Sequence, residues 1–97
     1  MPSLSISPNA ERGLQRCRRF LKGKNPLAAK RAAAEIEPNL RMLISVPEIG
    51  RPYQDEPKLR EVVIRFGDSG YIAQYSYDKS RDLVIVTAFR HQREASY

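Results

Sequence analysis

The chain has 97 residues, of which 41% are hydrophobic and 29% charged, and it carries a formal net charge of +6. This length gives room for one small domain over residues 1–97, and the composition excludes a disordered or fibrous chain. No apolar run approaches the roughly 20 residues that a membrane span needs, and we expect a cytoplasmic protein without a secretory signal.

The N-terminal residues predict a strand followed directly by a helix. Residues 3–7 alternate serine with leucine and isoleucine, which is typical of a short strand with one apolar face. Ser7 can cap the helix, Pro8 suits its first position, and Gly23 ends it. The apolar stripe of this helix consists of Ala10, Leu14, Cys17 and Leu21. Cys17, the single cysteine, is therefore predicted to be buried, and it excludes an internal disulfide.

The other face of the first helix is basic. It carries Arg12, Arg16, Arg18, Arg19, Lys22 and Lys24. Residues 1–50 hold nine basic and four acidic side chains, whereas residues 51–97 hold eight and seven, so the first half carries +5 of the net charge. This asymmetry indicates an acidic partner, either a nucleic acid or an acidic protein segment. The structural alternative is a solvated helix face.

A second helix is predicted to begin at Asn25, a capping residue, and Pro26. Its apolar residues keep the helical period across Pro38, although proline removes one backbone hydrogen bond and disfavours helical angles in the residue before it. We therefore expect a kinked helix, or two abutting segments, that ends before Pro47. The two helices should form a hairpin.

The rest of the chain predicts a loop and three strands. Residues 46–57 are proline-rich and aperiodic, which is typical of a connecting loop. Strands are predicted over 59–66, 71–77 and 83–89, and the last is so apolar that it suits a central strand covered on both sides. Three tyrosines on one strand face are explained by packing against the helices: Tyr71, Tyr75 and Tyr77. The order β-α-α-β-β-β predicts an α+β fold, with a helical hairpin on one face of a mostly antiparallel four-stranded sheet.

Sequence signatures of enzymes are missing. The chain has no glycine-rich phosphate loop, no paired metal-ligand spacing and no nucleophile elbow, and it contains one histidine, His91. We therefore expect neither a metal nor a cofactor.

Four segments, taken in order, resemble a known family. They are PEIGRP at 47–52, LREVVI at 59–64, YIAQYSY at 71–77 and VIVTAFRHQRE at 84–94. The last three resemble the C-terminal half of the RelE/ParE toxin superfamily of type II toxin–antitoxin systems, and the loop before them matches too. The predicted order of elements extends the resemblance over essentially the whole chain.

The resemblance implies one of two targets. ParE-like members poison DNA gyrase, whereas RelE-like members cut messenger RNA in the ribosomal decoding site, and the RHQRE exit looks more like the ParE group. Members of both branches are neutralised by an antitoxin whose flexible segment wraps the toxin. We therefore expect a ParE-like, growth-arresting toxin of the plasmid-stabilisation type that inhibits DNA gyrase and forms a hetero-oligomer with a cognate antitoxin. Exposed edges and apolar grooves between helix and sheet should accept the antitoxin.

The alternative is a metal-independent, ribosome-dependent endoribonuclease that binds the ribosome and messenger RNA. Such cleavage needs a base, a cation and an acid around one phosphate. The candidates are Arg60, His91, Arg93, Glu94 and Tyr97. Arg60 matches an arginine of RelE-like nucleases, and Arg93 and Tyr97 fall near the family's C-terminal Arg and Tyr. Residues 53–58 depart from that pattern, since two acids and one lysine stand where the nuclease branch tends to have lysines.

Under the gyrase hypothesis, the basic helix and the C-terminal segment are the contact surfaces. The predicted target-binding residues are Arg16, Arg19, Arg60, Arg90, His91 and Arg93. Some of them have structural alternatives: Arg60 can pair with a strand acid such as Glu61, and His91 can be a turn residue bonded to the backbone. A third hypothesis is an inactive relative that serves only as an antitoxin-binding module.

Overall fold

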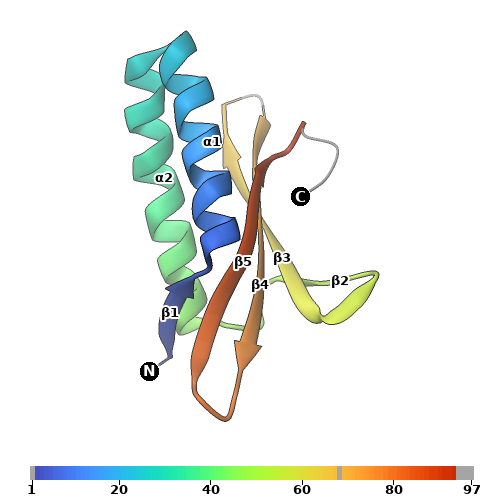
Figure 1. Ribbon diagram of the computed structural model, residues 1–97. Helices are drawn as coiled ribbons and strands as arrows, with labels where there is room; N and C mark the ends of the chain where they lie inside the picture. The colour runs from blue at the N-terminus through green and yellow to red at the C-terminus, as the bar shows by residue number, and fades with distance from the viewer. Residues whose placement is uncertain (1, 68, 94–97) are drawn as a thin grey trace.

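Figure 1 shows the computed structural model, in which two helices cover one face of a five-stranded sheet. The structure describes residues 2–67 and 69–93. Its elements are β1 (Ser3–Ile6), α1 (Pro8–Lys24), α2 (Pro26–Ser45), β2 (Arg51–Tyr53), β3 (Glu56–Phe66), β4 (Ser69–Asp78) and β5 (Leu83–His91). The strand order is β1-β5-β4-β3-β2, with β1 parallel to β5 and the other neighbours antiparallel. The predicted α+β fold, with a helical hairpin on a mostly antiparallel sheet, is confirmed.

Helix α1 begins as predicted. The Ser7 hydroxyl accepts a hydrogen bond from the Ala10 N–H at 3.1 Å, and Pro8 occupies the first turn, where a missing N–H breaks no helical bond. Ala10 is fully buried against the sheet and Cys17 is 7% exposed. The predicted packing role of Cys17 is therefore confirmed.

One residue joins the two helices. The Asn25 N–H donates to the Leu21 carbonyl at 2.7 Å, which closes α1, and the Asn25 side chain accepts from the Ala28 N–H at 3.1 Å, which opens α2. Helix α1 accordingly ends at Lys24, one residue beyond the predicted stop at Gly23. The extended backbone of Asn25 ends the helix, and Gly23 stays helical.

Helix α2 continues through Pro38 as a single helix, so the prediction of two abutting segments is wrong (Figure 1). Proline removes the N–H that would bond the Ala34 carbonyl, and its ring crowds the same turn. The neighbouring Glu35 carbonyl accepts a hydrogen bond from the Asn39 side-chain amide at 2.8 Å. Ala32 before the proline and Leu40 and Leu43 after it are buried, so both halves of the helix pack on the core. Neither helix in the described part of the chain has an apolar stretch of membrane-spanning length.

The sheet has one strand more than the four predicted. Strand β2 lies inside the segment predicted as a loop, where Arg51 pairs with Glu61 and Pro52 with Arg60. Strand β3 also begins at Glu56, three residues before the predicted start. A three-residue strand is too short to show alternation, and Pro52 is tolerated because β2 is an edge strand.

Strand β4, at the centre of the sheet, is the most buried strand. Its residues from Gly70 to Gln74 are all buried, and Tyr75 is fully buried. Strand β5 lies between β1 and β4, so its predicted interior position in the sheet is confirmed. Val84, Val86, Ala88 and Phe89 are buried, whereas its other positions are half-buried, so its two faces are not covered equally. The less covered face is half-buried because the helices lie on one side of the sheet (Figure 1). The tyrosines of β4 pack in or against the core, as predicted.

Gly13 explains how closely α1 approaches the sheet. A Cβ atom at this position would lie 2.1 Å from the carbonyl oxygen of Phe89 in β5. Only a residue without a side chain fits there, which accounts for a glycine that otherwise weakens the helix. This close contact joins the basic helix to the strand that carries the predicted C-terminal site.

Candidate functional site

Figure 1 shows the end of the molecule at which α1 is followed by α2, which we call the tip end. A cavity beside the second half of α1 at this end is lined by three of the six predicted target-binding residues. Its volume is about 630 Å³, and it lies between the second half of α1, the end of β3, the start of β4 and the end of β5. Its cationic residues, its histidine and its two phenylalanines are Arg16, Lys24, Arg93, His91, Phe20 and Phe66. We call this cavity the tip cleft. Three predicted residues, Arg16, His91 and Arg93, therefore line one cavity.

His91 is held at the floor of the tip cleft by both ring nitrogens. Its Nδ1 accepts a hydrogen bond from the Arg93 N–H at 3.1 Å, and its Nε2 lies 3.0 Å from the Ser69 hydroxyl. The Tyr71 ring meets the imidazole edge-on, with 5.5 Å between the ring centres. With Nδ1 accepting, the neutral ring carries its hydrogen on Nε2. This arrangement fits a residue that orders the turn before Arg93 better than one poised to take a proton.

Phe20 gives the cleft an exposed aromatic wall that the sequence interpretation did not assign to the site. Its side chain is 62% exposed, and the Lys24 ammonium lies 4.7 Å from the centre of its ring. A cation at this distance is attracted by the ring face. The sequence did indicate its position, because Phe20 lies beside the apolar stripe of the helix and not within it. A side chain there lies at the edge of the buried face. The sequence does not indicate that Phe66 lines a cavity, because it looks like an ordinary apolar residue at the end of a predicted strand.

The other three predicted target-binding residues lie outside the tip cleft: Arg19, Arg90 and Arg60. Arg19 is exposed on α1 and does not line the cavity. Arg90 pairs with Ile72 on the sheet face turned away from the helices, and its Nη1 donates to the carbonyls of His91 at 3.3 Å and Gln92 at 3.4 Å. Arg90 therefore stabilises the backbone at the end of β5 and just after it.

Arg60 is used to hold a loop. Its Nη1 donates to the Gly50 carbonyl at 2.7 Å and to the Glu48 carbonyl at 3.2 Å, which pins the segment between α2 and β2. The Gly50 N–H in turn donates to the Tyr75 hydroxyl at 2.8 Å. Burial, the largest effect, raises the pKa of Tyr75 and keeps its hydroxyl protonated. We call these contacts the loop clamp; they differ from the pairing with Glu61 considered above.

The loop clamp and the tip cleft are far apart. Arg60 pairs with Tyr75 and His91 pairs with Tyr71, so the two residues are four positions apart along β4 and lie on its opposite flanks. Four strand residues span about 13 Å. The structure thus does not bring Arg60 together with His91 and Arg93. Glu94 and Tyr97 lie outside the described residues.

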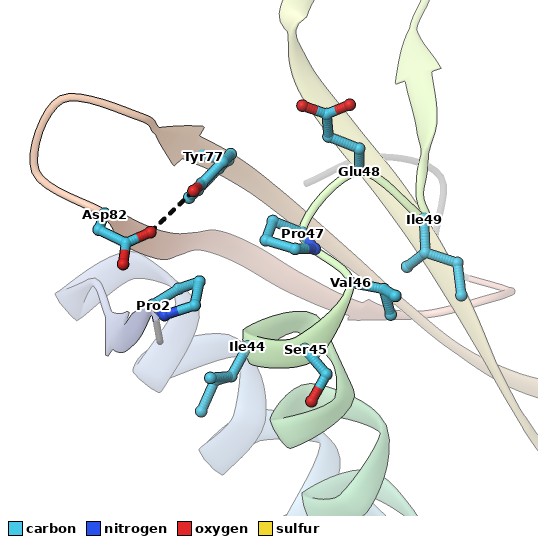
Figure 2. A pocket seen from close by; sticks show the side chains of 9 residues that line it. All are labelled: Pro2, Ile44, Ser45, Val46, Pro47, Glu48, Ile49, Tyr77 and Asp82. Atoms are coloured by element: carbon cyan, nitrogen blue, oxygen red, sulfur yellow. Dashed lines mark hydrogen bonds between the residues drawn. The ribbon is translucent and has the colours of Figure 1, made fainter.

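A second hollow, also of about 630 Å³, lies at the opposite end, which we call the loop end. Figure 2 shows Ile44 from the end of α2 and Pro47 from the following loop on the side of Pro2, Tyr77 and Asp82, with Val46 and Ile49 on the other side of the loop. The Tyr77 hydroxyl donates to Asp82 at 2.8 Å, and this bond is the main reason that the pKa of Tyr77 is raised. None of the predicted target-binding residues lines this hollow, which contains the carboxylates of Glu48 and Asp82.

The described residues offer no group of three or more histidine, cysteine, aspartate or glutamate side chains that could hold a metal ion. Among the described residues that line the tip cleft, none is acidic. What the cleft presents is guanidinium and ammonium groups beside exposed aromatic surface. Chemically, this arrangement suits binding of an anionic or carboxylate-bearing partner.

Comparisons with known proteins agree with this architecture. Residues 4–96 match the family described as "ParE toxin of type II toxin-antitoxin system, parDE". The chain is also 33% identical, over 94 residues, to a protein of Caulobacter vibrioides named Toxin RelE3. That alignment covers 97% of this chain and 98% of the relative.

Proposed function

This chain belongs to the ParE toxin family of type II toxin–antitoxin systems, and on that basis we propose that it poisons DNA gyrase. In this proposal the toxin binds gyrase and stalls the complex in which the enzyme has cut its DNA. The tip cleft is the contact surface, with Arg16 and Arg93 as the binding residues and Phe20 as an apolar anchor. The family implies a cognate antitoxin that neutralises the toxin.

The observation that carries the proposal is the separation of the predicted nuclease residues. Cleavage of RNA without a metal needs its base, cation and acid within hydrogen-bonding distance of one phosphate. Arg60 is bound to two carbonyls of the loop clamp, whereas His91 and Arg93 lie at the tip end. This distribution favours a binding surface over a catalytic site.

The tip cleft has the residue types of a protein-binding hot spot. Arginine and aromatic side chains dominate binding energy at interfaces, particularly where a rim of other residues excludes water. Arg16 and Phe20 are exposed on one turn of α1, and Arg93 lies across the cleft from them. A carboxylate of the target could accept a bidentate bond from either guanidinium.

The proposal is tested in bacteria by pulse-labelling in the first minutes after the toxin is induced without its antitoxin. Gyrase poisoning predicts early loss of thymidine incorporation while methionine incorporation continues. The control is the double variant Arg16→Ala/Arg93→Ala, which should leave both labels unaffected. Immediate loss of methionine incorporation would contradict the proposal and assign the ribosome as target.

A second candidate is the ribosome-dependent endonuclease, which the name of the Caulobacter relative favours. Under this alternative, Arg60 and Arg93 bind phosphate and His91 or Tyr97 transfers a proton. The test is a triple substitution of Arg60, Arg93 and Tyr97 by alanine, followed by mapping of messenger RNA ends in induced cells. Undiminished cutting by the triple variant would exclude this mechanism.

For the antitoxin we propose the hollow at the loop end (Figure 2) as a docking site. Val46 is 43% exposed and Ile49 is 51% exposed there, so apolar surface is available to a segment that folds on binding. Because both side chains are exposed, Val46→Ser and Ile49→Ser should leave the toxin folded and toxic. Co-expressed antitoxin should then rescue growth poorly; full rescue of the double variant would place the antitoxin elsewhere.

A further inference from the structure

The half of the helical hairpin nearest the tip end, between Glu11 in α1 and Glu35 in α2, exposes basic side chains and no acidic one. Between Glu11 and Glu35 the sequence contains eight basic residues and no acidic one. The structure exposes all eight, which are Arg12, Arg16, Arg18, Arg19, Lys22, Lys24, Lys30 and Arg31. The tip cleft accounts for only Arg16 and Lys24 among them. The other six are not used by the proposed function.

Three of these residues form a row along α1. Arg12, Arg19 and Lys22 follow one another at seven and three positions, close to two turns and one turn of helix, so they share one face. The buried residues Ala10, Gly13 and Cys17 lie on the opposite face, against the sheet. Ten residues of helix span about 15 Å. We call this set the outer basic row.

The outer basic row matches a repeating anionic backbone. A strand of duplex DNA places one phosphate about every 3.4 Å along the helix axis, so a straight row of about 15 Å parallels several phosphates. Two of the three residues are arginines, whose planar guanidinium groups bind phosphate in a bidentate manner. We propose that the toxin itself binds the phosphate backbone of duplex DNA through this row, without reading sequence.

A lipid surface fits these residues less well. A helix that lies in a membrane interface inserts an apolar face into the lipid. The apolar face of α1 packs against the sheet, and the large apolar side chains exposed near the tip end are Phe20 and Leu27, which lie on different helices. The Lys24 ammonium also covers the Phe20 ring. The row therefore presents charge without the apolar area that insertion requires.

This binding goes beyond the proposed function, because it requires neither gyrase nor the tip cleft. It gives the toxin a second contact with the complex in which gyrase holds cut DNA. The two interactions are independent: a protein that binds duplex DNA but leaves gyrase active overturns the proposed function alone. A protein that stalls gyrase but does not bind DNA overturns this inference alone.

The test is fluorescence anisotropy with a labelled 30-base-pair duplex of mixed sequence, titrated with full-length toxin at several potassium chloride concentrations. The variant Arg12→Ala/Arg19→Ala/Lys22→Ala removes the row. A control with the same net charge, Arg41→Ala/Lys58→Ala/Arg65→Ala, removes three exposed cations from other surfaces. All substitutions are on exposed side chains, and thermal unfolding followed by circular dichroism checks that each variant folds.

We expect the row variant to bind at least 10-fold more weakly at 100 mM salt, and the control less than threefold. The slope of the logarithm of the binding constant against the logarithm of salt concentration is negative. In the row variant it should become less steep by about 2.7, since each of three lost phosphate contacts removes about 0.9. Equal losses in the two variants would overturn the inference, because net charge would then suffice. The inference is also overturned if the wild type does not bind the duplex at 50 mM salt. Tighter binding to phosphatidylglycerol-containing vesicles than to the duplex would overturn it too. So would polyglutamate that displaces the labelled duplex as well as unlabelled duplex of equal charge does.

Discussion

The two ends of the molecule use arginine in opposite ways. At the loop end, Arg60 is half-buried and donates to two backbone carbonyls, so its charge holds a segment that contains no regular structure. At the tip end, Arg16 and Arg93 are exposed around an open cavity. The carboxylates of Glu48 and Asp82 lie at the loop end, whereas the described lining of the tip cleft has none. The surroundings of an arginine, and not its presence in a family motif, decide whether it serves the fold or a partner.

The largest effect should follow from disturbing the contact between α1 and β5, because it places the helix that carries Arg16 and Phe20 against the sheet. Gly13→Ala places a Cβ 2.1 Å from the Phe89 carbonyl oxygen, and backbone must move to admit it. We expect the free energy of unfolding to fall by about 3 kcal/mol. Gly23→Ala is the matched control, since nothing lies within 4 Å of its added Cβ, and it should stabilise the protein by about 0.5–1 kcal/mol. Urea denaturation measures both; equal effects would contradict the close contact.

The next effect concerns the buried half of the loop clamp. Tyr75→Phe removes the hydroxyl that accepts the Gly50 N–H and leaves a buried donor without its acceptor. The expected loss of stability is about 2 kcal/mol. Tyr77→Phe, on the same strand face, removes a hydroxyl that donates to Asp82 at the edge of an open hollow, so its loss should be smaller. Thermal unfolding measures both variants. A lower melting temperature for Tyr77→Phe than for Tyr75→Phe would show that the bond between Gly50 and the Tyr75 hydroxyl does not hold the loop.

Arg60 itself should matter for stability more than an arginine of the same strand that faces solvent. Arg60→Ala removes two charge-assisted bonds to carbonyls, and we expect a loss of about 1.5 kcal/mol. Arg65→Ala, at an exposed position of β3, should change stability by less than about 0.5 kcal/mol. Indistinguishable denaturation midpoints for the two variants would contradict the claim that Arg60 stabilises the fold through its bonds to the loop.

The smallest expected effect is a dependence of stability on pH, which arises from Asp78 at the loop end. Hydrogen bonds from Ser80 and Arg81 lower the pKa of Asp78 from 3.8 to about 2. A carboxyl whose pKa is lower in the folded protein stabilises it above the unfolded pKa, and this contribution is lost as the pH falls from about 4 toward 2. Asp78→Asn should therefore flatten the decline in melting temperature over that window. An unchanged decline would show that the turn does not depend on the carboxylate.

Local patterns in the sequence account for much of this fold. Ser7 and Asn25 cap the helices because each side chain accepts a hydrogen bond from the backbone N–H three residues later, a relation that the local sequence contains. Strand β2 was missed because its three residues are held only by pairing with β3. The continuity of α2 through Pro38 was missed because it depends on tertiary packing: Ala32 before the proline and Leu40 and Leu43 after it are buried in the same core.

The candidate site was less predictable than the fold. The sequence identified Arg16, His91 and Arg93 separately, and the structure places them in one cleft. It could not show that Arg60 is bound to the carbonyls of Glu48 and Gly50, since that contact depends on how a loop returns to the sheet. A motif thus identifies residue types, whereas their neighbours are set by tertiary packing.

The most direct test of the account compares the two ends in one gyrase assay. Purified toxin variants are mixed with gyrase and plasmid, and the linear DNA released from stalled cleavage complexes is measured alongside the unfolding free energy of each variant. We expect Arg16→Ala/Arg93→Ala to lose at least 10-fold in potency while its stability changes by less than about 1 kcal/mol, and Arg60→Ala to lose stability but keep its potency under conditions where it is folded. A folded Arg16→Ala/Arg93→Ala variant with full potency, or an Arg60→Ala variant that is stable but inactive, would contradict the account.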